Sequence, residues 1–296
     1  MSAGLLVIGD VVTDVVVRHT APFAHATDTP ARIRIVPGGA AANVACWAAH
    51  RGCREVRLLA RVGADRAGWH EERLRASGVR PVLVRDPEAP TATVVALVDA
   101  AAERTFLTDS GASLRLTAED VATQPWEGVG HLHLSGYLFF GEVSRPAALA
   151  AVSAAADRGV PVSVDPASAG FIERHGTDRF LADLAGVDLL LPNGDEAALL
   201  TGLADPGAAA VALSRRVPLV VLTLGAEGAL IAADGRLIAR VPAPAVRPVD
   251  STGAGDAFTG GFLAARLAGA GPAEAAEAGC AAGAEAVAVV GGRPPR

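Results

Sequence analysis

The segment from Asp250 to Phe258 holds the residues best suited to chemistry. It reads Asp-Ser-Thr-Gly-Ala-Gly-Asp-Ala-Phe and opens an Ala- and Leu-rich stretch with a helical pattern. The small side chains of Gly253, Ala254 and Gly255 leave the backbone N–H groups unobstructed. Because a helix N-terminus offers unsatisfied donors and a positive dipole end, this turn predicts a site for a phosphate group.

Asp256 lies in the first turn of the predicted helix, where we expect the helix dipole to keep its carboxylate ionised. A carboxylate beside a phosphate site can accept the proton of a hydroxyl whose oxygen attacks phosphorus. The alternative is an acidic residue at the start of an ordinary helix, and the surrounding segment argues against it. The sequence thus predicts phosphoryl transfer to an alcohol, with Asp256 as the base.

The chain contains no lysine, and all 26 of its Lys and Arg residues are Arg. A Walker-A lysine, a protein-kinase lysine and a Schiff-base lysine are therefore excluded. Any phosphate chemistry must use backbone amides, arginine and a metal ion.

Two further motifs offer hydrogen-bonding groups to hydroxyls. Gly38 and Gly39 precede an Ala-rich helical stretch and allow a polar ligand to approach the backbone, and Asn43 adds a donor and an acceptor. Asp10 and Asp14 follow the first apolar run, and open α/β sheets bind ligands beyond the carboxyl ends of their strands. Taken alone, the first motif could be a helix-entry turn and the second could supply capping or turn residues.

The segment 250–258 resembles the C-terminal signature of the ribokinase-like, or PfkB, family of carbohydrate kinases, and the similarity extends over nearly the whole chain. In that family the aspartate matching Asp256 is the catalytic base, and the amides matching residues 253–255 form the anion hole. The resemblance also implies that Gly38, Gly39 and Asn43 hold the sugar. Asp14 would bind sugar hydroxyls, and the position of Asp10 is commonly acidic.

The resemblance further implies a site for ATP and Mg²⁺. Asn193 and Glu196 resemble the family's Asn-x-x-Glu motif, which organises Mg²⁺ and the nucleotide phosphates largely through water, and Mg²⁺ does keep much of its hydration. Thr223, Gly225 and Gly228 match a turn that contacts the nucleotide. Residues 288–294 loosely match a loop that, with the region of Asp250, holds a monovalent cation such as K⁺ in some members.

The chain departs from the family pattern at several positions. Relative to ribokinase, Ala40 replaces a Lys, Val12 replaces an Asn, and Ser135 stands where a sugar-binding Glu is expected, which argues against a strict ribose kinase. The segment Asp165-Pro-Ala-Ser-Ala169 lacks an Arg that helps to hold acidic sugars in some members. We therefore expect a small neutral sugar, although Arg34 or Arg104 could compensate for the missing Arg.

Short apolar runs alternate with Ala-rich helical segments, which predicts an α/β fold with a mostly parallel sheet and helices on both faces. Together with the resemblance, this predicts a single ribokinase-like domain over residues 1–296, a three-layer α/β/α sandwich. Two stretches of period-two character, about 11–36 and 79–107, are expected to form antiparallel strands of a small β lid. The predicted strands are 5–8, 56–60, 131–135, 160–164, 189–191 and 219–222. The predicted helices are 42–51, 69–77, 145–157, 197–201, 254–267 and 273–289.

The composition and the start of the chain argue against several other classes of protein. A net charge of −6 gives no electrostatic case for nucleic acid or an anionic membrane, and no long uninterrupted apolar stretch predicts a membrane span. The start of the chain lacks a signal-peptide layout, so we expect a cytoplasmic protein. Three scattered cysteines predict reduced thiols, and the His131 and His133 pair lacks a third ligand for a metal. The resemblance makes a homodimer through the lid possible.

Three alternatives remain in view. A nucleoside kinase of the same family would use the same motifs, since a sugar and a nucleoside both present a CH₂OH on a furanose-like ring. A non-catalytic binder that kept the fold is disfavoured by the intact run from Gly253 to Asp256. A dinucleotide-dependent oxidoreductase is disfavoured because no Gly-x-Gly-x-x-Gly follows the first strand.

Overall fold

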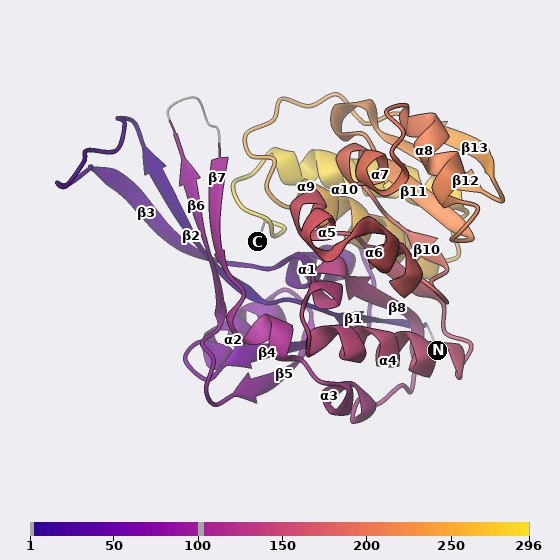
Figure 1. Cartoon of the computed structure of the whole chain (residues 1–296), viewed down its shortest axis with the longest axis horizontal. Helices are drawn as coiled ribbons and strands as arrows, with labels where there is room; N and C mark the ends of the chain where they lie inside the picture. The colour runs from indigo at the N-terminus through magenta and orange to yellow at the C-terminus, as the bar shows by residue number, and fades with distance from the viewer. Residues whose placement is uncertain (1–2, 100–103, 296) are drawn as a thin grey trace.

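A computed structural model describes residues 3–99 and 104–295 and contains two sheets (Figure 1). The larger sheet has nine strands in the order β13-β12-β11-β10-β9-β8-β1-β4-β5. Its strands from β11 to β5 pair in parallel, and β12 and β13 add an antiparallel edge. The strand bounds are β1 Gly4–Ile8, β4 Val56–Gly63, β5 Arg80–Asp86, β8 Val129–Ser135, β9 Val162–Asp165, β10 Leu189–Leu190, β11 Leu219–Thr223, β12 Ala229–Ala233 and β13 Arg236–Val241.

Helices cover both faces of this sheet. One face packs against α1 (Ala40–His50), α2 (Ala67–Ala76), α9 (Ala254–Leu267) and α10 (Pro272–Val287). The other face packs against α3 (Ala118–Ala122), α4 (Ser144–Ala156), α5 (Ala169–His175), α6 (Thr177–Asp183), α7 (Gly194–Thr201) and α8 (Pro206–Leu213). The alternating side chains of β1 explain why helices cover both faces. Leu5 and Val7 point to the first set of helices, and Leu6 and Ile8 point to the second. A strand buried on both faces reads as a continuous apolar run, and the predicted three-layer arrangement is confirmed.

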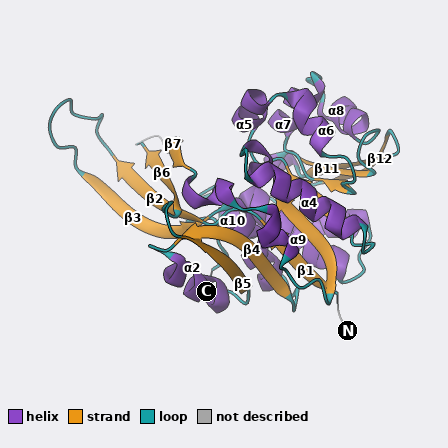
Figure 2. Ribbon diagram, turned by 60° about the horizontal axis from the view of Figure 1, so that its bottom comes forward, coloured by secondary structure: helices purple, strands orange, loops and turns teal. Residues whose placement is uncertain are grey.

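The second sheet has four strands in the order β3-β2-β6-β7 and projects from one side of the layered body (Figures 1 and 2). Its strands are β2 Val12–His19, β3 Ala31–Gly38, β6 Ala92–Val98 and β7 Arg104–Asp109. The sheet is mixed, because β2 pairs antiparallel with β3 but parallel with β6. The expectation of purely antiparallel strands was therefore wrong in this detail.

Strand β5 also corrects the sequence analysis, which placed residues 79–107 in the small sheet. Residues 80–86 instead form the edge of the large sheet, in parallel with β4. Val82 and Val84 pack on the core at one face of the sheet and Leu83 packs on the core at the other, while Arg80 and Arg85 near the ends of the strand are exposed. A half-buried edge strand with charged residues resembles a strand of a separate layer, so the sequence pattern alone could not distinguish them.

Several smaller features bear on the sequence predictions. Cys46, Cys53 and Cys280 are free thiols. His131 and His133 are buried on β8, and both contact Oγ of Ser163, at 2.8 and 2.9 Å. No described helix is by itself both long and apolar enough to cross a membrane; α7 and α8, which meet at 64°, reach that length and composition only as a pair.

Candidate active site

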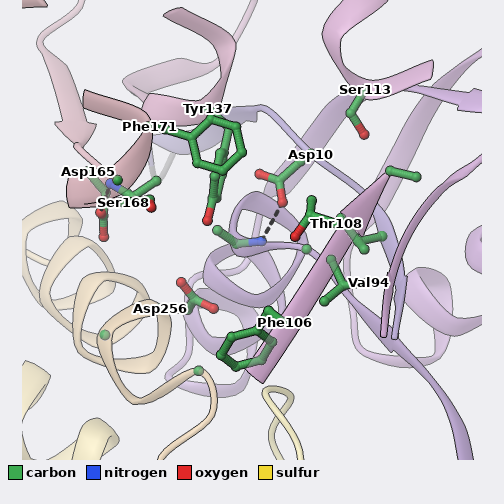
Figure 3. Close-up of a pocket in the computed structure, with 18 of the residues that line it drawn as sticks. Asp10, Val94, Phe106, Thr108, Ser113, Tyr137, Asp165, Ser168, Phe171 and Asp256 are labelled. Carbon is green, nitrogen blue, oxygen red and sulfur yellow. Dashed lines mark hydrogen bonds between the residues drawn. The ribbon is translucent and has the colours of Figure 1, made fainter. Parts of the chain in front are cut away.

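A cavity of about 690 Å³ lies between the two sheets, where the parallel strands end (Figure 3). Its wall combines the ends of β1, β9 and β11, the start of α9, and the inward face of the second sheet. Among the residues predicted to form the site, those that line this cavity are Asp10, Asp14, Gly39, Asn193, Glu196, Thr223, Gly253, Ala254, Gly255 and Asp256. Gly38, Asn43, Gly225 and Gly228 are not in its lining.

The start of α9 has the geometry of an anion site. Gly253 caps the helix at a φ of 73°, and a Cβ there would lie 2.5 Å from Cα of Gly292, so only glycine fits. Among the described groups, nothing accepts the N–H of Gly253 or Gly255, while Ala254 donates a long bond of 3.3 Å to the carbonyl of Ser251. Gly253, Ala254 and Gly255 all line the cavity, which makes the amides of this turn the candidate donors to phosphate oxygens.

Asn43 holds the carboxylate of Asp256. Its Nδ2 donates to Oδ2 of Asp256 over 2.8 Å, joining α1 to α9. Asn43 is buried, and its Oδ1 contacts no described donor. Gly292 packs so closely that a Cβ would lie 2.5 Å from Nδ2 of Asn43. The amide therefore orients the expected base, and its role as a direct ligand of the sugar stays a prediction.

Burial is the largest influence on the pKa of Asp256. Loss of solvent raises its pKa well above the ordinary range, the hydrogen bond from Asn43 offsets part of this rise, and the nearby carboxylates of Asp165, Asp10 and Asp14 add to it. We expected the helix dipole to keep this group ionised, whereas burial and the nearby like charges favour its protonated form. A raised pKa brings the carboxyl closer to the range in which a base can exchange protons near neutral pH.

Asp10 ties the first strand to α1. Its Oδ2 accepts from the N–H of Ala40 at 2.7 Å, and its Oδ1 accepts from the N–H of Ala41 at 3.3 Å and from Oγ of Ser135 at 2.9 Å. Two positions that depart from ribokinase, Ala40 and Ser135, thus both donate to this carboxylate. Asp10 caps the helix as well as lining the cavity, so the capping alternative weighed from the sequence is part of its role.

The side chain of Asp14 and the backbone of Asp10 leave no room for side chains at Gly38 and Gly39. A Cβ on Gly38 would lie 2.1 Å from Oδ2 of Asp14, and Gly39 has a φ of 98° with the carbonyl of Asp10 directly against it. Burial, with the charge of Asp10, raises the pKa of Asp14 to about 7, and Arg293 partly opposes this. Asp14 accepts a hydrogen bond from no described group, which leaves its oxygens for a ligand.

Glu196 and Asn193 form a capping box at the start of α7. The side chain of each accepts the backbone N–H of the other, both at 2.9 Å. Burial, and then the charge of Asp165, raise the pKa of Glu196 to about 8, and burial raises the pKa of Asp165 to about 6. Two buried carboxyls that destabilise each other's charge suit a hard divalent cation. No three acidic, His or Cys side chains converge on one point within the described residues, in keeping with an ion that takes most of its ligands from water and phosphate.

The nucleotide turn is only partly in the cavity. Thr223 ends β11, and its N–H donates to the carbonyl of Pro192, which places it beside Asn193. Gly228 has a φ of 95°, and a Cβ there would lie 1.9 Å from the carbonyl of Val241, so this glycine is needed for strand packing. Nucleotide contacts at Gly225 and Gly228 stay predictions.

Several lining residues were not predicted from the sequence. Asp165 stands at the end of β9, and its Oδ1 accepts the N–H of Ala167. Tyr137 and Phe171 form another wall (Figure 3). Arg174 also lines the cavity, with its guanidinium 4.5 Å from the ring centre of Phe171. The strand-end position of Asp165 was a usable signal, whereas the other three come from short helical turns with no distinctive spacing.

Comparison with known proteins supports the same conclusion. The pattern of the pfkB family carbohydrate kinases matches residues 2–296. A fructokinase of Klebsiella pneumoniae is 32% identical over 273 residues, which is 89% of this chain and 84% of that protein.

Two solved structures have closely similar folds. An adenosine kinase from Sinorhizobium meliloti superposes with a TM-score of 0.88 at 25% identity, over 100% of this chain and 97% of that one. A putative ribokinase II from E. coli, in complex with ATP and Mg²⁺, superposes with a TM-score of 0.83 at 24% identity, over 98% and 94% of the two chains. The ribokinase-like fold is confirmed, and the chain belongs to the pfkB family of carbohydrate kinases, phosphotransferases with an alcohol group as acceptor.

Proposed function

We propose that this protein transfers the γ-phosphate of ATP to a hydroxyl of a small sugar, with Asp256 as the base. The observation that carries the proposal is the position of Asp256. Its carboxyl is held at 2.8 Å by Asn43, in one cavity with Asp14 and next to the amides of residues 253 and 255, which donate to no acceptor in the described part of the chain. The carboxylates around the acceptor position favour uncharged hydroxyls there. We therefore keep the expectation of an uncharged group for the end of the substrate that reacts.

The residues divide the reaction between them. Asp14 accepts hydrogen bonds from sugar hydroxyls and orients the ring. Asp256 takes the proton of the acceptor hydroxyl as its oxygen forms a bond to the γ-phosphorus and the bond from phosphorus to the bridging oxygen of ADP breaks. The amides at residues 253–255 hold the charge that develops on the transferred phosphoryl group.

Nucleotide and metal would lie at the opposite wall. Thr223 and Asn193 border the cavity where the phosphates of ATP are expected, and Glu196 and Asp165 supply the oxygen groups that fit Mg²⁺. When bound, Mg²⁺ neutralises charge on phosphate oxygens. The fold shared with a kinase solved in complex with ATP and Mg²⁺ supports this assignment.

A monovalent cation such as K⁺ is a further part of the proposal. Asp250 accepts from the N–H of Thr252 at 2.8 Å and of Gly291 at 3.2 Å, so the loop before α9 and the end of the chain are tied together. K⁺ is expected to raise kcat relative to Na⁺ at equal ionic strength. Equal rates in the two salts would remove this part of the proposal.

The second sheet is proposed to act as a lid and as a dimer contact. Its inward face borders the cavity through Val94, Phe106 and Thr108 (Figure 3). Its outward face exposes Ile33 and Leu107, at 61% and 57% of their surfaces, which would be covered if two copies paired through this face. Sedimentation equilibrium is expected to give a dimer, and the double variant Ile33→Asp, Leu107→Asp a monomer.

An acceptor panel tests the main proposal. The purified protein is given ATP and Mg²⁺ with fructose, ribose, adenosine and further sugars, and ADP formation is followed together with ³¹P NMR of the product. At least one acceptor should raise ADP formation well above the acceptor-free rate and yield a phosphate monoester. ATP consumption that no hydroxyl compound stimulates would refute the proposal.

A nucleoside kinase is the second candidate. It is favoured by the TM-score of 0.88 to a protein described as an adenosine kinase, and by the Tyr137 and Phe171 rings, which could stack on a base. Adenosine outperforming every sugar in kcat/KM would select it. A non-catalytic binder is the least supported alternative, since Asp256 and residues 253–255 line the same cavity as Asp14.

A further inference from the structure

Three arginines extend from the active site along the inward face of the second sheet. Arg18, Arg32 and Arg34 line a second cavity of about 290 Å³, which shares Asp14, Val94 and Phe106 with the main cavity. On a strand, alternate residues share a face; Ile33 and Ile35, which flank Arg34, point to the opposite side and are exposed. The three guanidinium groups are thus directed toward the substrate cavity by the register of β2 and β3.

The three arginines are exposed to solvent and carry like charges at neighbouring positions, and a bound anion would relieve their mutual repulsion. Arg18 lies directly opposite Arg32 across the strand pair, and Arg34 lies opposite Val16. Like charges that face each other across a sheet destabilise it. No described carboxylate lies within ion-pair distance of any of the three. The nearby carboxylate of Asp250 is already engaged with the N–H groups of Thr252 and Gly291.

The spacing suits a group on the substrate itself. Arg34 pairs with Val16, two residues beyond Asp14, so the Cα step from Asp14 along the sheet is ~7 Å. An extended arginine side chain covers a similar length. A sugar whose hydroxyls meet Asp14 and Asp256 would therefore bring a substituent on its far carbon to Arg34. Thr223 and Glu196, at the expected nucleotide wall, border the main cavity but not the second one.

We propose that Arg34, with Arg32 and Arg18, forms an anion subsite, and that the preferred sugar carries a phosphate or carboxylate group at the end away from the reacting hydroxyl. Arginine is suited to both groups because its planar fork donates two parallel hydrogen bonds. The inference rests on the proposed kinase function and revises the expectation of a wholly neutral substrate, which had relied on Ala169 in place of an Arg.

Matched acceptor pairs test it. We would measure kcat/KM for fructose against fructose 6-phosphate, ribose against ribose 5-phosphate, and an aldose against its aldonate. The wild type should prefer one charged class over its neutral partner by about tenfold or more, the size expected for a charge-assisted contact. The phosphorylated and carboxylated arms distinguish the two sources of the anion. No preference for any charged member would overturn the inference and leave the sugar kinase proposal intact.

Substitutions at the three arginines test whether these residues cause the preference for a charged acceptor. Arg34→Gln and the triple variant Arg18→Gln, Arg32→Gln, Arg34→Gln should reduce the charged-to-neutral ratio of kcat/KM by about tenfold or more. Arg236→Gln, an exposed arginine on the distant strand β13, is the matched control and should keep the wild-type ratio. The ratio is insensitive to loss of folded enzyme. If the variants instead raised KM for ATP equally with every acceptor, the arginines would serve the nucleotide and the inference would be wrong.

Discussion

Asp256 and its neighbours combine two opposing influences on one carboxyl. Burial and the surrounding acids raise its pKa, while the hydrogen bond from Asn43 lowers it. The sequence placed Asp256 at a helix start and suggested an ionised group, because a helix start is visible in the residue pattern. The burial and the converging carboxylates come from segments far apart in the chain, as the Asn43 contact illustrates, and no local pattern encodes them.

Removing the amide of Asn43 tests the balance between burial and hydrogen bonding that sets the pKa of Asp256. In Asn43→Ala the pKa of Asp256 rises, so the acid limb of kcat/KM moves to higher pH, and kcat falls by about 10–100-fold as the base loses its orientation. Asn43→Asp should move the limb further, since it adds a like charge. The check is a pH–rate profile of all three proteins. An acid limb that stays in place would show that Asn43 serves only as a sugar ligand.

Glu196 offers a second test among single side chains. Glu196→Gln keeps a capping side chain for the N–H of Asn193 but removes a negative charge from the expected Mg²⁺ site. The Mg²⁺ concentration for half-maximal activity should rise by about tenfold or more. Asp195→Asn, the neighbour in the same helical turn, is the control and should leave it near the wild-type value. Equal shifts in the two variants would contradict a specific role for Glu196.

Among the secondary-structure elements, the long helices and most strands of the large sheet were predicted, whereas β12, β13 and four short helices were missed. Helix α9 was predicted with its observed bounds, because Gly253 marks its start and an Ala-rich pattern runs to Leu267. Helices α3, α5, α6 and α8 have only 5, 7, 7 and 8 residues and offer few turns for a periodic pattern. Strand β5 was found but assigned to the wrong sheet, because pairing partners are set by tertiary structure.

The two ends of α9 allow a matched test of the anion turn. Gly253 and Gly269 both have positive φ, 73° and 97°, but only at Gly253 would an added Cβ meet backbone atoms, the nearest at 2.5 Å. Gly269→Ala should lower the free energy of unfolding by about 1–2 kcal/mol through strain alone. Gly253→Ala should cost a further ~1–3 kcal/mol through steric overlap. Urea denaturation measures both, and equal losses would contradict the close approach of Gly292.

Across the whole molecule, two sheets meet at one cleft. Most of its acids follow the strands of the large sheet, Asp14 lies on β2 next to them, and Arg18, Arg32 and Arg34 lie farther along the small sheet. The sequence predicted both layers and most of the acids. It did not indicate which face of the small sheet the arginines occupy, because that depends on the register of β2 against β3. Charge separation within one cleft is what a substrate with a hydroxyl end and an anionic end requires.

The acidic cluster also predicts how stability depends on pH. The folded pKa values of Asp14 and Glu196, about 7 and about 8, exceed their ordinary values of 3.8 and 4.5, so the folded state binds more protons. Their contribution is complete below their ordinary pKa values and is lost progressively until the pH passes the folded values of about 7 and about 8. The Tm of the Mg²⁺-free protein should therefore fall between about pH 7 and 8, a range above the ordinary pKa of the buried histidines, and level off at higher pH. Scanning calorimetry measures this, and a flat or rising Tm would contradict the clustering.

The most direct measurement of the central claim is single-turnover phosphoryl transfer by Asp256→Asn, using whichever acceptor the wild type phosphorylates best. The substitution preserves shape and removes the group that takes the proton. The rate constant should fall by about 10²–10⁴-fold, with acceptor binding by calorimetry and Tm close to those of the wild type. A rate within about tenfold of the wild type, in a variant that folds and binds the acceptor normally, would show that Asp256 is not the base.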